Sequence, residues 1–307
     1  MTDRNSGKSV AIIGAGAMGC FFAARLASSG AEVTLVDIDA ARLAMLEESG
    51  IVLEADEGVV TAKVSARLAA DLEGPFSLVV VFTKGMHTAA AVASVGHVAG
   101  GGTPVLTLQN GIGNAEVIAA HFPGENVLMG VTDYPADLKD ARTVASHGKG
   151  QIRLGGFCPQ AMVHVPDIAD LLNTAGLDTV VDDEVEVVIW EKLAFNAALN
   201  SIATVTGLPN GGFDMAAGHR IIEQVVAETV AVAGAKGIAL DSQRIHAKIA
   251  WALKHHRTHQ PSMLQDRLAG RQTEIDQING AIAREAAALG LRVPVTSTLA
   301  DLVRLVS

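Results

Sequence analysis

The chain has 307 residues, of which 49% are apolar and 18% are charged, and its formal net charge is -10 at pH 7. A chain of this length and composition can bury a large core in two domains of ordinary size. The acidic balance excludes nucleic acid and anionic membranes as main partners, because both require a basic protein surface.

The cysteine content and the absence of long apolar runs indicate a cellular compartment. Cys20 and Cys158 are far apart and lack the spacing of metal ligands, which favours a reducing compartment over a disulfide framework. No apolar run in the sequence reaches the roughly 20 residues of a membrane helix, and residues 1–8 are polar, unlike a secretory signal. We therefore expect a cytoplasmic, soluble protein.

A strand, a glycine-rich turn and a helix follow one another near the amino terminus. Residues 10–13 are an apolar run of β type, residues 14–19 read Gly-x-Gly-x-x-Gly, and residues 20–29 have helical periodicity. Glycines at these positions let the backbone approach a pyrophosphate closely, and the start of the helix offers N–H groups to the phosphates. The pattern predicts a dinucleotide site at Gly14, Gly16, Ala17, Met18 and Gly19.

An acidic residue at the end of the second predicted strand bears on the choice of cofactor. Residues 32–36 form that strand, and Asp37 follows it at the distance from the glycine turn that is typical of a ribose-binding acid. A carboxylate there accepts hydrogen bonds from the ribose and repels a 2′-phosphate. Ile38 and Asp39 supply no arginine, although Arg42 could approach from the next helix. The sequence predicts NAD as the preferred cofactor, with NADP as the alternative.

Strand and helix patterns alternate in the first part of the chain and then give way to helical periodicity alone. Further buried strands are predicted at 58–64, 78–82, 104–108, 127–131 and 151–154, with helices at 88–98, 114–121 and 163–176 and an extended piece at 177–183. Only helices are predicted beyond this point, at 185–205, 220–236, 241–254, about 264–289 and 298–305. We expect an α/β fold: a Rossmann-type, mostly parallel sheet in a dinucleotide-binding domain (1–183), then an all-helical substrate and catalytic domain (184–307).

Polar residues stand where ligands bind in such folds. Lys84 and Asn110 follow two predicted strands, and the carboxyl ends of parallel strands form the ligand-binding edge. Asn110 is also typical of a turn before glycine. Lys192, Asn196 and Asn200 have the i, i+4, i+8 spacing of one helix face. This row either faces an oxygen-rich substrate or consists of a lysine that reaches solvent and asparagines bonded to loops, and the segment alone leaves both open.

Six separated motifs in the same order resemble those of ketopantoate reductases over nearly the whole chain. They are the glycine turn (13–19), Lys84 after a strand, Gln-Asn-Gly (109–111), Lys192 with Asn196 and Asn200, Pro-Asn-Gly (209–211), and Ser-Met-Leu-Gln-Asp (262–266) followed by Thr-Glu-Ile-Asp (273–276) and Ile-Asn-Gly (278–280). The resemblance implies the reduction of a 2-keto acid, 2-dehydropantoate to pantoate, by hydride from a nicotinamide.

The resemblance also implies roles for individual residues. Lys192 would be the general acid and Glu274 its hydrogen-bonded partner; without the motif, Glu274 would be expected to pair with Arg271 on its own helix. Lys84 would lie by the cofactor. The keto acid and the nicotinamide end of the cofactor would be held by Asn110, Asn196, Asn200, Asn210 and Ser262.

One loop departs from the family pattern. Where the family has a small neutral Thr-rich loop, this chain has Asp133 and Tyr134, its only tyrosine. These residues either reshape the substrate end of the pocket or point to solvent at a turn. Together with Asp37, they leave open an alternative within the family, an NAD-dependent D-2-hydroxyacid dehydrogenase for another acid.

Three other functions account for fewer of the motifs in the sequence. The β-hydroxyacid dehydrogenases share a Lys-x-x-x-Asn pair, but their glycine-rich lead into the catalytic helix is missing here. A non-catalytic NAD-binding protein would not need Lys192 and Glu274. The histidines at 255, 256 and 259 have no glutamate in a zincin pattern, so no metal site is expected. The oligomeric state is left open, with a homodimer as one alternative.

Overall fold

The computed structural model of the protein describes residues 5–100 and 102–307. The chain divides into two compact units. Unit 1 takes the chain up to Gln109 together with Asn114–Val185, and unit 2 takes Asn110–Gly113 together with Glu186–Ser307. The short segment Asn110–Gly113 therefore packs with the second unit although both of its neighbours in sequence belong to the first.

Unit 1 is built on a sheet that, within the described residues, has eight strands in the order β12-β11-β8-β7-β6-β1-β2-β5. Neighbouring strands are parallel except β11, which is antiparallel to β8. The bounds are β1 Ser9–Ile13, β2 Glu32–Val36, β5 Ser65–Arg67, β6 Leu78–Val81, β7 Val105–Thr107, β8 Val127–Thr132, β11 Ile152–Gly156 and β12 Thr179–Val181. The expected mostly parallel sheet is confirmed.

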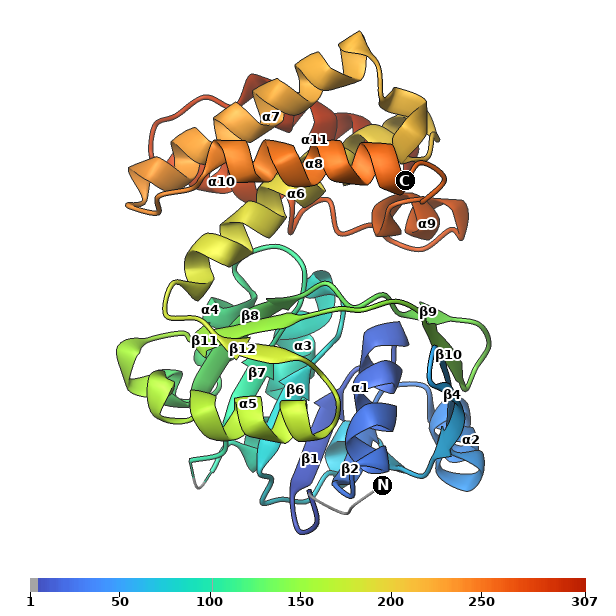
Figure 1. The fold of residues 1–307 in the computed structure, drawn as a ribbon. Helices are drawn as coiled ribbons and strands as arrows, with labels where there is room; N and C mark the ends of the chain where they lie inside the picture. Colours follow the sequence, from blue (N-terminus) through green and yellow to red (C-terminus); the bar gives the residue numbers. More distant parts are fainter. Residues whose placement is uncertain (1–4, 101) are drawn as a thin grey trace. The chain divides into compact units, whose positions relative to one another are not determined.

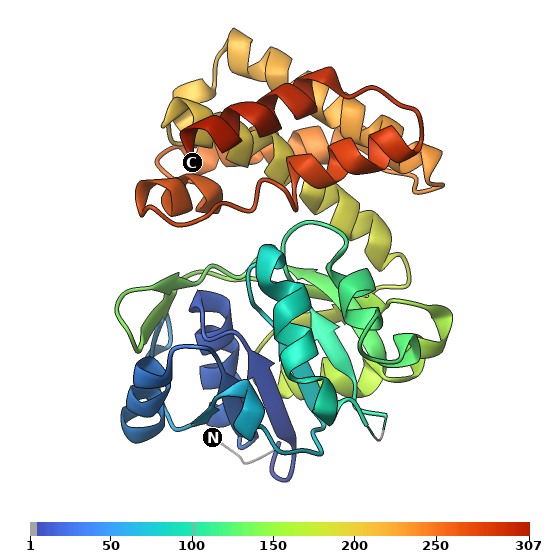
Figure 2. The same cartoon turned by 180° about the vertical axis from the view of Figure 1, so that it is seen from behind.

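Helices cover both faces of this sheet because its central strands are apolar on both sides. In β1, Val10 and Ile12 join one buried cluster and Ala11 and Ile13 join another, as the alternation of side chains along a strand requires. Figures 1 and 2 show α1 and α5 on one face and α3 and α4 on the other. The bounds are α1 Ala17–Ser28, α3 Thr88–Ser94, α4 Asn114–Ala119 and α5 Val165–Thr174.

A second, smaller sheet corrects one prediction. Residues 58–64 were expected to be a buried strand of the main sheet, but β4 pairs antiparallel with β3 in a separate sheet of order β4-β3-β10-β9. Val59 is 67% exposed in this sheet. Its β-branched side chain correctly indicated a strand, but β-branched residues also occur in exposed strands. Within the described residues the bounds are β3 Ile51–Ala55, β4 Gly58–Ala62, β9 Asp137–Leu138 and β10 Thr143–Ser146, with helix α2 Ala40–Ser49 before β3.

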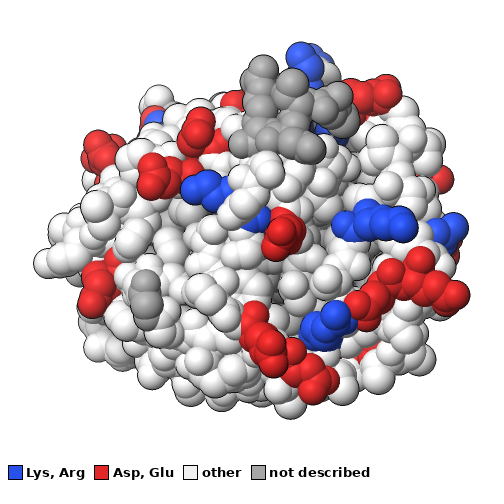
Figure 3. Space-filling model, turned by 90° about the horizontal axis from the view of Figure 1, so that it is seen from below, with Lys and Arg blue, Asp and Glu red and all other residues white. Residues whose placement is uncertain are grey.

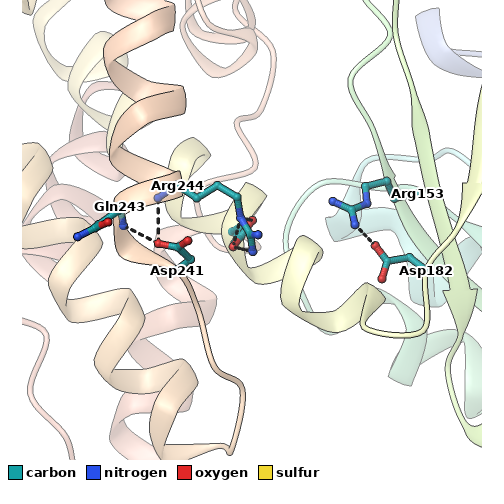
Figure 4. Close-up of polar contacts among 6 residues, drawn as sticks. Arg153, Asp182, Asp241, Gln243 and Arg244 are labelled. Atoms are coloured by element: carbon teal, nitrogen blue, oxygen red, sulfur yellow. Dashed lines mark hydrogen bonds and ion pairs between the residues drawn. The ribbon is translucent and has the colours of Figure 1, made fainter.

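Unit 2 is helical, and its helices share one apolar core. Their bounds are α6 Val185–Thr206, α7 Ala216–Ala235, α8 Ser242–His255, α9 Ser262–Leu268, α10 Asn279–Ala288 and α11 Pro294–Val306. Asp241 caps α8, because its carboxylate accepts the N–H groups of Gln243 and Arg244 (Figure 4). Glu228 of α7 does the same for the start of α11 by accepting the N–H groups of Val295 and Thr296.

The expected helical segment from about 264 to 289 is wrong as a single element. It is interrupted between α9 and α10, where Gly270 has a φ of +65° and the N–H of Arg271 turns back to the carbonyl oxygen of Asp266. Glycine adopts this left-handed backbone at low cost, which is why it ends helices. The apolar periodicity continues across the break because the intervening turn also buries Ile275 and Ile278 in the core.

The surface agrees with the acidic composition. On the face shown in Figure 3, Lys and Arg side chains lie scattered among Asp and Glu side chains rather than in one basic patch. Among the helices of the described residues, none combines the length and apolar character needed to cross a membrane.

Candidate functional site

The glycine turn after β1 is tightly packed against the neighbouring strands. Gly14 has a φ of +104° and donates its N–H to the carbonyl oxygen of Val36 at 2.7 Å. A Cβ on Gly14 would lie 2.8 Å from the backbone nitrogen of Thr83, and one on Gly19 would collide with the carbonyl oxygen of Gly14. Both positions therefore need glycine, one for backbone conformation and close approach and the other for close packing of helix on turn.

Gly16 differs from the other two glycines of the turn because its surroundings are open. It is exposed, its φ is −69°, and no heavy atom of the neighbouring structure would lie within 4 Å of an added Cβ. Gly16 is also the N-cap residue of α1 and has no side chain to bond to the first turn, where Ala17 and Met18 are half-buried. Open space beside the N-terminus of a twelve-residue helix fits an anionic group such as a pyrophosphate.

Asp37 is bonded directly to the glycine turn. Its Oδ2 accepts the N–H of Ala15 at 2.7 Å, and its Oδ1 accepts the N–H of Ile38 at 2.7 Å. Sequence spacing alone did not predict the bond to Ala15, which fixes the carboxylate at the carboxyl end of β2. This edge lies where β1 has β2 on one side and β6 on the other, and such a reversal of strand order is where open α/β sheets bind ligands.

Arg42, the candidate ligand for a 2′-phosphate, has other partners. Its Nε donates to the carbonyl oxygen of Ala141 at 2.7 Å, and its Nη2 lies 3.4 Å from the sulfur of Cys20. The thiol of Cys20 is buried and donates to the carbonyl oxygen of Ala15, and burial raises its pKa above the ordinary value. Cys20 and Cys158 are both free thiols.

Lys84 stands just beyond β6, as expected. It is half-buried and is the N-cap residue of the short 3₁₀ helix η2 Gly85–His87. The carbonyl oxygen of Thr83 accepts the side-chain amide of Gln109, which follows β7, at 2.6 Å. The carboxyl ends of β6 and β7 are thus tied together by this hydrogen bond.

The predicted polar row lies on α6 in unit 2. Lys192 and Asn196 are half-buried, whereas Asn200 is 4% exposed. Asn110, from the segment after β7, belongs to the same unit, and its Oδ1 lies 3.5 Å from Nδ2 of Asn196. The structure therefore brings together residues 110 and 196, which are 86 positions apart in sequence.

The close approach that holds Asn110 there depends on the glycine after it. Gly111 has a φ of +85°, and a Cβ on it would collide with the carbonyl oxygen of Gln277. The N–H of Ile112 donates to that same oxygen at 3.3 Å. Gln-Asn-Gly is thus a structural motif as well as a candidate binding motif, because only glycine fits between Asn110 and the turn before α10.

Two further predicted residues, Asn210 and Ser262, lie at the first positions of short helices in unit 2. The N–H of Asn210 donates to the carbonyl oxygen of His259 at 3.1 Å, and that of Gly211 donates to the carbonyl oxygen of Arg257 at 2.8 Å. Asn210 is 3% exposed, and its Oδ1 has no hydrogen-bond partner. Ser262, at the first position of α9, is exposed.

Glu274 lies in the interruption between α9 and α10 and not on a helix with Arg271. The expectation that these two would be neighbours on one helix is therefore wrong, and Arg271 pairs with Asp266 at 2.8 Å instead. Glu274 is half-buried, and its carbonyl oxygen accepts the N–H groups of Gln277 and Ile278. These two hydrogen bonds fix the backbone of Glu274 although the residue lies outside both helices.

Tyr134 is half-buried, and both its ring and its hydroxyl are engaged inside unit 1. The ring lies 5.4 Å from that of Phe21, and the hydroxyl accepts the N–H of Asp178 at 2.8 Å. A Cβ on Gly150 would run into the ring as well, 2.6 Å from Cδ1. Asp133 accepts the N–H of Gln151. Asp133 and Tyr134 thus bond the loop after β8 to the residues that precede β11 and β12.

The residue that precedes Lys192, Glu191, was not predicted from the sequence to have a special role. Glu191 is 3% exposed, and Nε of Arg244 donates to its two carboxylate oxygens at 2.9 and 3.0 Å. This pair joins α6 to the first turn of α8 (Figure 4). A glutamate inside the apolar run of α6 signals that some cation must accompany it, but the sequence does not say which one. Figure 4 also shows the pair Arg153–Asp182, which joins β11 to the chain after β12.

Comparison with known proteins identifies the family. The profile described as "Ketopantoate reductase PanE/ApbA" matches residues 10–158, and the profile described as "Ketopantoate reductase PanE/ApbA C terminal" matches residues 184–307. The chain belongs to the ketopantoate reductase family. It is accordingly an oxidoreductase, as the motif order implied.

Individual proteins resemble the chain over nearly its full length. A 2-dehydropantoate 2-reductase of Halobacterium salinarum is 31% identical over 298 residues, covering 96% of this chain and 98% of the relative. The structure of a D-mandelate dehydrogenase with NADH and anilino(oxo)acetate superimposes with a TM-score of 0.93 at 30% identity, covering 97% and 98% of the two chains. A 2-dehydropantoate 2-reductase from Geobacter metallireducens gives 0.91 at 27% identity, covering 97% and 100%.

Proposed function

We propose that the protein reduces the carbonyl group of a 2-keto acid to a 2-hydroxy acid, with NADH as the preferred hydride donor and NADPH as the alternative. The observation that carries this proposal is the carboxylate of Asp37, which is bonded to Ala15 of the glycine turn at the carboxyl end of β2. A carboxylate held there would accept the ribose hydroxyls of NADH and repel the 2′-phosphate of NADPH.

The glycine turn supplies the other half of this cofactor site. The open space at Gly16 and the N-terminus of α1 would receive the pyrophosphate, with Gly14 and Gly19 keeping the turn compact. Lys84, beyond the neighbouring strand β6, would lie beside the cofactor and add a positive charge. The domain of residues 1–183 would thus bind the dinucleotide, and residues 184–307 would provide the acid and most substrate contacts.

Lys192 would protonate the carbonyl oxygen during reduction. NADH, when bound, would supply hydride to the carbonyl carbon, and negative charge would build on the oxygen as that bond forms. An ammonium within about 3 Å stabilises this charge and then transfers its proton. Glu274 would keep Lys192 in the charged form, which opposes the loss of a proton that burial favours. The overall change is keto acid, NADH and one proton to hydroxy acid and NAD⁺.

Neutral side chains would hold the carboxylate and substituent of the substrate. Asn110, Asn196 and Asn200 would donate hydrogen bonds without adding a titrating group. Asn210 and Ser262 would do the same from the starts of two short helices. The pairing of Asn110 with Asn196 supports this part of the proposal, because it places an amide of the strand-end segment beside the row on α6.

Two substrates merit direct comparison. The similarity to the 2-dehydropantoate 2-reductase of Halobacterium salinarum favours 2-dehydropantoate, a branched aliphatic keto acid, as the substrate of this protein. The similarity to D-mandelate dehydrogenase with NADH, combined with the NAD-type Asp37, favours a second candidate function, that of an NAD-dependent D-2-hydroxyacid dehydrogenase acting on a bulkier acid. We place 2-dehydropantoate first because the curated relatives share that activity over the full chain.

The test is a spectrophotometric assay of NADH oxidation with 2-dehydropantoate, phenylglyoxylate and pyruvate, repeated with NADPH. The wild-type protein should reduce at least one keto acid, and Lys192→Met should lower kcat by about a thousandfold or more while the Kd for NADH stays within about twofold. Lys248→Met, which removes an exposed lysine of α8, is the matched control. Equal turnover by Lys192→Met and wild type would eliminate Lys192 as the acid.

A further inference from the structure

A chain of buried and half-buried hydrogen bonds connects the two ends of the segment Asn110–Gly113. Its centre is Thr88 at the start of α3, whose side chain is 1% exposed. The Thr88 hydroxyl accepts a hydrogen bond from Nε2 of Gln109 at 2.9 Å and lies 3.2 Å from Oδ1 of Asn114, to which it donates. Gln109 and Asn114 are the residues that flank the segment on either side.

The partners of Gln109 set the orientation of its side-chain amide. Nε2 of Gln109 also donates to the carbonyl oxygen of Thr83 at 2.6 Å, and its Oε1 accepts the hydroxyl of Thr107 at 2.9 Å. A flipped Gln109 amide would place Oε1 against the carbonyl oxygen of Thr83, which cannot donate, so Nε2 must face Thr83. Buried networks that are fully satisfied and directional hold their members rigidly.

The network flanks the segment in which the chain passes from unit 1 to unit 2 and back. Gln109 and Asn114 belong to unit 1, whereas Asn110–Gly113 packs in unit 2, where the N–H of Ile112 is bonded to Gln277 and Asn110 lies beside Asn196. The segment is short, and Gly111 and Gly113 both have positive φ. The position of Asn110 therefore depends on how firmly the two flanking residues are held.

We propose that Thr88 is a positioning residue for substrate binding: its hydroxyl fastens both ends of Asn110–Gly113 and so places the amide of Asn110 for the keto acid. This rests on the proposed function of Asn110. Thr88 acts through Gln109 and Asn114 and is not itself a catalytic residue. Loss of its hydroxyl leaves the bond from Gln109 to Thr83 in place, so the loop that carries Lys84 keeps its anchor.

The test compares Thr88→Val, which keeps the shape and removes the hydroxyl, with Thr88→Ser, which restores the hydroxyl. Thr229→Val is the control, because Thr229 is 0% exposed in α7 and its hydroxyl bonds only locally, to the carbonyl oxygen of Val225. The first readout is amide hydrogen exchange at Ile112. Thr88→Val should raise its rate about tenfold, as expected for one or two lost hydrogen bonds, and neither Thr88→Ser nor Thr229→Val should.

The second readout is kinetic. For the keto acid that the wild type reduces best, Thr88→Val should raise KM about tenfold, with the Kd for NADH changed less than about threefold and with recovery in Thr88→Ser. An unchanged exchange rate at Ile112, or a Thr88→Val protein that matches Thr229→Val in both readouts, overturns the proposal. If the wild type reduces no keto acid, the proposed function fails, while hydrogen exchange still decides whether Thr88 holds the segment.

Discussion

Gly16 offers a sharp test of where the cofactor binds, because an added methyl group there meets no protein atom. Its backbone angles, φ −69° and ψ −170°, are allowed for alanine, and nothing lies within 4 Å of the added Cβ. Gly16→Ala should therefore cost less than about 1 kcal/mol of folding stability, the scale of an unfavourable N-cap residue. The methyl group would instead occupy the space proposed for the pyrophosphate.

The expected loss of affinity follows from the hydrogen bonds that the methyl group prevents. A hydrogen bond to a charged group is worth about 1.5–3 kcal/mol, so keeping the phosphate away from one N–H should weaken NADH binding about 10- to 100-fold. Fluorescence titration with NADH gives the Kd, and thermal unfolding gives the stability. Gly234→Ala, at an equally open position on α7, is the control and should stabilise by about 0.5–1 kcal/mol with unchanged Kd. An unchanged Kd for Gly16→Ala would refute the reasoning.

Three further predictions concern cofactor choice, stability and pH. Asp37→Asn keeps an acceptor for Ala15 but removes the charge, so kcat/KM for NADPH relative to NADH should rise about tenfold; an unchanged ratio would place the discriminating charge elsewhere. Arg244→Ala leaves the buried carboxylate of Glu191 without this cation and should lower the unfolding free energy by about 2 kcal/mol, less than for a fully buried pair because the Arg244 side chain is 49% exposed; an unchanged melting temperature would contradict this. Burial raises the pKa of the Cys20 thiol above its ordinary 9.0, so its contribution to stability is present below about pH 9 and is lost as the pH rises further. The wild type should therefore lose more melting temperature than Cys20→Ala between about pH 8 and pH 10, and parallel losses would show that Cys20 does not titrate with unfolding.

The side chain of Tyr134 holds the loop after β8 in place. Because its ring packs on Phe21 and its hydroxyl is bonded to Asp178, the loop after β8 is held by unit 1 itself. Burial raises the pKa of the Tyr134 hydroxyl, which keeps it protonated under ordinary conditions.

The sequence by itself determined the features that depend on local pattern. Apolar runs and glycine spacing predicted β1, the turn at Gly14–Gly19 and α1, because strand, turn and helix propensities act over a few residues. The long apolar periodicity starting at Val185 predicted α6 almost to its last residue. The motif order also predicted the family, which the comparisons confirmed.

Only the tertiary structure decided which distant residues share a partner. The bond from Ala15 to Asp37, the pairing of Glu191 with Arg244 and the network around Thr88 all join elements whose separation along the chain carries no periodic signal. The break at Gly270 escaped prediction because the turn after it still buries isoleucines at helical intervals. The sequence pattern shows which side of a helix or strand is apolar. Packing of the whole core decides which neighbouring element covers that side and which partner each buried charge or amide bonds to.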